Sequence, residues 1–192
     1  MNELIAGLLL FLGVHSIRIV GDGWRSAQIA RWGEGPWKGL YALTAAIGLG
    51  LIIWGYHLAQ AQPYVLWTPP SWLRYFGALL TAPAFVLLAA AYVPGNRIKA
   101  AIGHPMVAGV KLWAFSHLLA NGTLAALLLF ASFLAWASLD FASARKRDRA
   151  GSIRYPAGAL SRDVVAVVVG LLAWALFAFL LHGWLIGVTP FA

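Results

Sequence analysis

Long apolar stretches constrain this chain of 192 residues more than any other feature. A transmembrane helix needs about 20 consecutive, mostly apolar residues to cross the hydrocarbon core of a bilayer. Stretches of about this length lie at residues 3–20, 36–58, 71–93, 104–120, 122–140 and 164–186. No small-residue cleavage site follows the first stretch, so we expect it to be a retained helix. The sequence therefore predicts an all-α integral membrane bundle of about six transmembrane helices, forming one domain over residues 1–192.

The composition agrees with a membrane protein. Hydrophobic residues make up 61% of the chain and charged residues only 10%, whereas a soluble domain carries about 25% charged residues. The net charge of +8 (14 basic minus 6 acidic residues) is explained by basic loops on the cytoplasmic side. The ten Trp residues fit interfacial belts better than a base-stacking surface. We therefore expect membrane lipid as a partner and no nucleic acid.

The basic residues predict the topology. They concentrate in or beside the first, third and fifth connections, at Arg18, Arg25, Arg31, Lys38, Arg97, Lys99, Arg145, Lys146, Arg147, Arg149, Arg154 and Arg162. The second connection (59–70), the Asn121-Gly122 turn and the tail 187–192 contain no Lys or Arg. Basic and neutral connections thus alternate, as the positive-inside rule requires of six spans. Both termini are predicted on the non-cytoplasmic side.

Two basic residues stand outside this pattern. Arg74, next to aromatic residues at the start of the third stretch, is interpreted as an interfacial anchor. Lys111 lies within the fourth stretch, where it either snorkels to the membrane surface or lines a polar cavity. The cluster at 145–149 is interpreted as a topology signal touching anionic lipid, with binding of a cofactor's anionic groups as the alternative.

Histidine is the only strong ligand type left inside the spans. The chain has no Cys, which excludes disulfides, thiolate nucleophiles and Cys-ligated clusters. All six acidic residues stand at or outside the span ends, so no carboxylate pair is available within the membrane. No serine-nucleophile motif or Gly-rich phosphate loop appears either.

The five histidines differ in position. At about 100° per residue, His117 shares a helix face with Trp113, and His15 shares one with Phe11. Each suits either an interhelical hydrogen bond or axial ligation of a haem held between helices. His104, directly before Pro105, is placed to cap a turn or to meet lipid headgroups. The remaining two, near span ends, are interpreted as interfacial: His57 and His182.

The segment GHPMVAGVKLWAFSHLLANG, together with an early VHS near the end of the first stretch, resembles the NnrU family of bacterial membrane proteins. That family also includes the plant and cyanobacterial 15-cis-zeta-carotene isomerases. The resemblance covers nearly the whole chain and implies a multi-pass protein of the bacterial inner membrane. It also implies b-type haem with redox or isomerase-like chemistry on a hydrophobic, isoprenoid-like substrate, or a role in denitrification and nitrogen-oxide metabolism.

Matched by motif, the resemblance implies that His15 and His117 are the iron ligands. Trp113, Lys111 and His104 are expected at the cofactor site, and Phe11 and Phe115 would complete the pocket wall with Trp113. The isomerase branch carries a cysteine three residues before the second histidine, where this chain has Ala114, so a thiolate ligand is excluded. Because His15 and His117 are predicted at different depths, pairing of His15 with His104 is a second ligand set.

Two other functions stay open at the level of sequence. HPxxxG before a span also resembles the RHP motif of isoprenylcysteine and phospholipid methyltransferases, which bind S-adenosylmethionine. Gly103 replaces the arginine of that motif, and the last span lacks the glutamate those enzymes use for the cofactor. The other alternative is a non-enzymatic assembly protein in which the polar face of the fourth stretch docks a partner helix.

Overall fold

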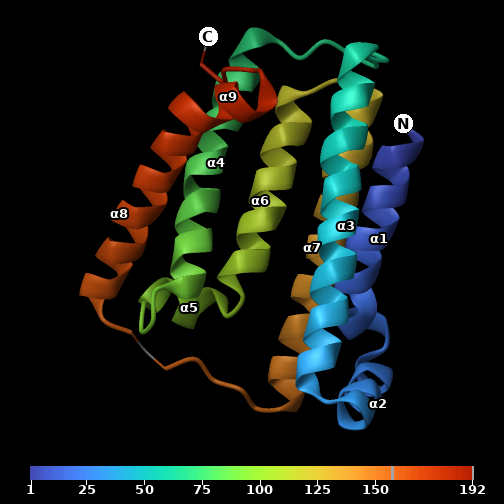
Figure 1. The fold of residues 1–192 in the computed structure, drawn as a ribbon. Helices are drawn as coiled ribbons and strands as arrows, with labels where there is room; N and C mark the ends of the chain where they lie inside the picture. Colours follow the sequence, from blue (N-terminus) through green and yellow to red (C-terminus); the bar gives the residue numbers. More distant parts are fainter. Residues whose placement is uncertain (157, 192) are drawn as a thin grey trace.

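The computed structural model describes residues 1–156 and 158–191 and confirms an all-α fold (Figure 1). Apart from an isolated β-bridge between Val65 and Thr123, the regular structure of the described residues is helical. The helices are α1 (Asn2–Val20), α2 (Asp22–Trp32), α3 (Glu34–Ala61), α4 (Ser71–Tyr92), α5 (Arg97–Ile102), α6 (Pro105–Ala120), α7 (Leu124–Ala150), α8 (Leu160–Leu176), the π-helical turn η1 (Phe177–Leu181) and α9 (His182–Ile186).

Five helical segments in the described part are long and apolar enough to cross a membrane: α1, α3, α4, α7 and the continuous run Leu160–Ile186. Each coincides with a predicted stretch to within a few residues, apart from extensions at the start of α8 and at the end of α7. The remaining predicted stretch, 104–120, corresponds to α6, which has 16 residues. The largest extension is at the end of α7, which continues ten residues past 140, because Ala, Arg and Lys are strong helix formers.

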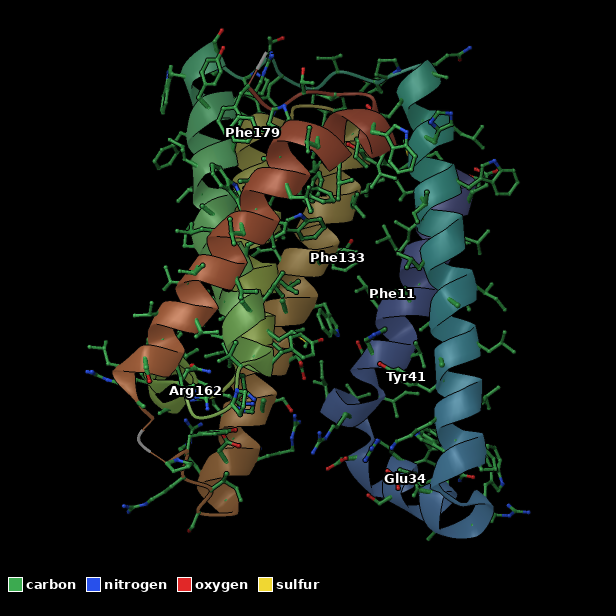
Figure 2. The ribbon with its side chains drawn as sticks, turned by 60° about the vertical axis from the view of Figure 1, so that its left-hand side comes forward. Phe11, Glu34, Tyr41, Phe133, Arg162 and Phe179 are labelled. Atoms are coloured by element: carbon green, nitrogen blue, oxygen red, sulfur yellow. The ribbon has the colours of Figure 1, made fainter. Side chains whose placement is uncertain are left out.

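The helices form two groups joined by α7. On one side α1 packs along α3, and on the other α4 packs between α6 and α8. α7 contacts both α1 and α6, so it connects the two groups (Figures 1 and 2). Both chain termini and α9 lie at one end of the bundle, here called the termini end. α2, α5 and the loop after α7 lie at the other, here called the α2 end.

Glycines allow the paired helices to approach closely. A Cβ atom on Gly7 of α1 would lie 2.6 Å from the backbone nitrogen of Ile52 in α3. A Cβ on Gly77 of α4 would lie 2.8 Å from the carbonyl oxygen of Ser116 in α6. Small residues at such contacts are typical of helix packing in membranes, where van der Waals contact replaces the hydrophobic effect.

The connection between α6 and α7 is the tight hairpin that the sequence predicts. Thr123 caps α7, because its Oγ1 accepts a hydrogen bond from the Ala126 backbone nitrogen at 3.2 Å. The Gly122 carbonyl accepts hydrogen bonds from the backbone nitrogens of Leu66 and Trp67, at 2.8 and 3.2 Å. The loop before α4 therefore lies against this turn, and a side chain at Gly122 would collide with Trp67.

Candidate functional site

Two cavities lie on opposite sides of the bundle, and each contains one of the two histidines singled out by the sequence. The His15 cavity, of about 700 Å³, lies between α1–α2–α3 and α6–α7 toward the α2 end. Its functional lining residues are His15, Arg18, Arg25, Glu34, Lys38, Tyr41, His104, Trp136, Asp140, Arg147, Asp148 and Tyr155. The His117 cavity, of about 480 Å³, lies between α4, α6 and α8–α9. Its lining includes Arg74, Ala78, Thr81, Phe85, Leu88, Trp113, His117, Asn121, Trp174, Phe177 and His182.

The His15 imidazole is fixed by its own helix and by aromatic rings. Its Nδ1 donates a hydrogen bond to the Phe11 carbonyl oxygen at 2.6 Å, because a carbonyl can only accept. The ring stacks on Phe11 with centroids 4.2 Å apart, and Tyr41 and Trp136 meet it edge-on at 5.2 and 5.8 Å. In the neutral ring, Nε2 then carries the lone pair, which is the state required of a metal ligand.

Trp136 brings an unpaired donor to the same cavity. Its Nε1 is buried and has no hydrogen-bond partner among the residues that the structure describes. A buried donor without a partner costs about 1–3 kcal/mol, and such groups are therefore uncommon in folded proteins. The indole N–H itself is not exposed to the cavity, so an acceptor atom of a bound molecule would reach it only after a small movement of the ring.

A second histidine of the cavity is held by a carboxylate. His104 Nε2 donates to Asp148 Oδ2 at 2.8 Å, and Tyr155 donates its hydroxyl to the same carboxylate at 3.2 Å. Burial, followed by the charge and hydrogen bond of Asp148, raises the pKa of Tyr155. Gly103, directly before His104, has φ +80°, a conformation that favours glycine. The carboxylate therefore fixes the imidazole with Nδ1 as its lone-pair nitrogen, the arrangement common behind metal-binding histidines.

Charged side chains gather at the α2 end of the His15 cavity. Four of its lining residues are basic and three are acidic, a net charge of +1 with neutral histidines: Arg18, Arg25, Lys38 and Arg147 against Glu34, Asp140 and Asp148. Lys38 pairs with Glu34 at 2.9 Å, and Arg147 approaches Asp140 only to 3.9 Å. The cavity thus combines an aromatic interior with a basic mouth.

His117 has the same local geometry as His15 but faces the other cavity. Its Nδ1 donates to the Trp113 carbonyl oxygen at 2.8 Å, and its ring stacks on Phe130 at 4.6 Å. Nε2 makes no hydrogen bond within the described part of the chain. Arg74 and His182, which the sequence assigned to the membrane interface, also line this cavity.

The structure does not bring His15 and His117 into one cavity. His15 meets Trp136 of α7, whereas His117 stacks on Phe130, six residues earlier, or about 9 Å along the helix axis. Between these levels, Phe133 contacts Phe11 at 5.7 Å and Trp113 at 5.6 Å. Figure 2 shows Phe133 and Phe11 pointing toward each other from α7 and α1. His15 and His117 therefore line different cavities, and His15 instead shares its cavity with His104.

Two other predicted pocket residues lie elsewhere. Lys111 lines neither cavity, and its Nζ lies 5.3 Å from the centroid of the Phe141 ring. Phe115 is 45% exposed on the outer face of α6, so the prediction that it walls the pocket is wrong. The reason is helical phase, because position 115 lies two residues from both Trp113 and His117 and therefore points to a different side.

The family of the chain is decided by comparison with known proteins. A family model described as "NnrU protein" matches residues 3–190. The chain belongs to the NnrU family. The comparisons with curated proteins and with solved structures gave no match. The family match confirms the resemblance predicted from the HP…SH…ANG segment, and it extends over both cavities of this NnrU protein.

Proposed function

We propose that this NnrU protein is a six-span protein of the bacterial inner membrane that binds haem b in the His15 cavity. In this orientation the α2 end is cytoplasmic, because the basic connections lie there, and both termini are outside. α6 serves as the sixth span at about 24 Å, short enough to sit inside the bundle between α4 and α7.

The observation that carries the proposal is that His15, with a free Nε2, and His104, held by Asp148, line one cavity with a basic mouth. His15 and His104, the latter oriented by Asp148, are the residues that would hold the haem iron. The volume of the cavity falls within the range of about 300–1,000 Å³ that small-molecule sites occupy. Arg18, Arg25 and Arg147 at the mouth supply cations for carboxylate groups of the bound molecule.

The chain's residues set the conditions for the reaction. Haem, when bound, supplies one-electron exchange at iron. Phe11, Tyr41 and Trp136 surround the His15 ring with aromatic surface. Asp148 holds the proton of His104 on Nε2, so that Nδ1 stays available as an acceptor. The ligand set implied by the family resemblance, His15 with His117, would require Trp113 and Phe133 to move apart.

Haem content tests this proposal. We expect the purified protein, supplemented with haem during expression, to give a Soret band and a pyridine-haemochrome signal near one haem per chain. His15→Ala should lose both signals, and His104→Ala should shift or weaken them. His57→Ala removes an exposed histidine outside both cavities and should change neither. A wild-type protein without a Soret band would reject haem binding.

The proposed substrate is a hydrophobic, isoprenoid-like molecule or a nitrogen oxide. The two are separated by activity of the reduced protein in vesicles. A change in the cis–trans ratio of an added polyene supports the first, and consumption of nitric oxide supports the second. Loss of the observed activity in His15→Ala, but not in His57→Ala, is the expected result in either case.

A further inference from the structure

We propose that the His117 cavity binds a single-chain anionic amphiphile, with its head group on Arg74 and its chain along α4. This inference concerns a different cavity from the proposed haem site and does not rest on haem binding.

The cavity is long and narrow along one face of α4. Its α4 residues are Arg74, Gly77, Ala78, Thr81, Phe85 and Leu88. Apart from the adjacent pair Gly77 and Ala78, each lies three or four positions from the next. From the first to the last is 14 residues, or about 21 Å of helix. Half of the hydrocarbon core of a bilayer is about 15 Å thick, so the slot accommodates a chain that reaches across one leaflet.

The wall of this slot around Thr81 offers apolar surface. The indole Nε1 of Trp174 donates to Thr81 Oγ1 at 2.9 Å, and the Thr81 hydroxyl donates to the Ala78 carbonyl at 2.6 Å. These polar groups therefore satisfy one another. Phe85, Leu88 and the ring of Trp174 remain to contact a ligand, as suits a hydrocarbon chain.

The termini end of the slot carries a cation. Arg74 makes no ion pair or hydrogen bond with any residue in the ranges 1–156 and 158–191. The six acidic residues of the chain all belong to other parts of the fold, between α1 and the start of α8. A guanidinium group binds carboxylate and phosphate oxygens in a bidentate manner. Charge complementarity thus favours an anionic head group next to Arg74.

A π-helical turn forms part of the wall. Phe177 and Ala178 line the cavity and belong to η1, where α8 departs from regular α-helix. Such turns are rare and occur frequently at functional sites. After η1 the chain turns back, so that His182 and Val188 also reach the cavity, and His182 Nδ1 donates to the Val188 carbonyl at 2.6 Å. The last residues of the fold thereby close the head-group end.

Quenching of tryptophan fluorescence by a dibrominated stearate tests the proposal, because Trp113 and Trp174 line the cavity. In delipidated protein held in neutral detergent we expect saturable quenching. Arg74→Gln should weaken the apparent affinity about tenfold, the effect of losing one charge-assisted hydrogen bond. Arg31→Gln, at an exposed arginine of α2 outside both cavities, is the matched control and should have no effect. Arg74→Lys should keep most of the affinity.

A neutral ligand and a filled cavity complete the design. Affinity for the dibrominated stearyl alcohol should be the same in wild type and Arg74→Gln. Ala78→Phe, which fills the slot, should abolish saturable quenching by both ligands while the helical circular dichroism is retained. Displacement by palmitate identifies a free fatty acid as the source, and displacement by lysophosphatidylglycerol identifies a lipid. Equal stearate affinity in wild type, Arg74→Gln and Ala78→Phe would overturn the proposal.

Discussion

The His15 cavity and the His117 cavity contain the same local motif in different surroundings. In both, a histidine donates Nδ1 to the carbonyl four residues earlier and leaves Nε2 without a hydrogen bond among the described residues. Around His15 the lining brings charged groups, a second histidine and an unpaired indole N–H. Around His117 it is mostly apolar, with one arginine at the end.

The position of a histidine on its helix face therefore does not by itself determine its role. The imidazole supplies the same lone pair in both places, and the neighbouring elements decide what it can serve. At the α2 end, the extension of α7 carries Asp148 to His104. At the termini end, η1 and α9 bring Phe177 and His182 instead. The first set suits a charged cofactor, and the second suits an amphiphile.

The largest expected effect concerns the aromatic partition, by which we mean the contacting rings of Phe11, Trp113, Phe130 and Phe133 between the two cavities. Phe130 is 5% exposed and contacts Trp113 and His117. Phe130→Ala should lower the free energy of unfolding by about 3–5 kcal/mol, as is usual for a buried Phe. Phe179→Ala, at a side chain 59% exposed, should change it by less than about 0.5 kcal/mol. Denaturation followed by circular dichroism measures both, and equal small effects would mean that the partition is not a packed structure.

The next effect distinguishes Asp148 from Asp163, two carboxylates near the α2 end. Asp148→Asn removes the charge that holds His104 and should weaken haem affinity about 10–100-fold, as losses of such supporting groups do. Asp163→Asn is the control, because Asp163 accepts from the Arg97 backbone nitrogen at 2.6 Å and lines neither cavity. Haem titration followed at the Soret band gives both values. Equal affinities in the two variants would remove His104 from the site.

A smaller effect compares the two indoles. Trp136→Phe removes the unpartnered N–H of the His15 cavity and should weaken haem binding about fivefold, the net contribution of one hydrogen bond. Trp174→Phe removes an N–H group already bonded to Thr81 in the other cavity. The same titration should show no change in this variant, and a larger loss there than in Trp136→Phe would contradict the assignment of cavities.

The smallest effect is expected at the rim of the His15 cavity. Glu34 and Lys38 pair at 2.9 Å, but their side chains are 69% and 72% exposed. Exposed pairs contribute about 0–1 kcal/mol, so Glu34→Gln should leave the thermal midpoint nearly unchanged. Thermal unfolding at low and high salt checks this, and a clear salt-dependent loss would show that the rim charges stabilise the fold.

Much of the fold could be predicted from the sequence, because apolar length and turn residues determine where membrane helices begin and end. The six stretches correspond to α1, α3, α4, α6, α7 and Leu160–Ile186. α2 was not predicted, since Asp22–Trp32 is a mixed polar and aromatic segment between two glycines. The π-helical turn η1 carries no recognisable residue signal in its sequence, FAFLL.

The candidate site could be predicted only in part. His15, His104, His117 and Trp113 do line cavities, because unusual polar groups within apolar helices face the protein interior. Which of them share a cavity depends on the position of α7 between α1 and α6, and spacing along the chain does not contain that information. The face Trp136, Asp140 and Arg147, at helical intervals along α7, is a signal that could have located the His15 cavity.

The visible spectrum of His117→Ala beside His15→Ala tests the central claim most directly, namely that the two histidines serve separate cavities. After haem supplementation, we expect His15→Ala to lose the Soret band and His117→Ala to keep the wild-type band position and intensity. A His117→Ala variant that loses the band as completely as His15→Ala, while its helical circular dichroism is retained, would contradict the separation of the two cavities.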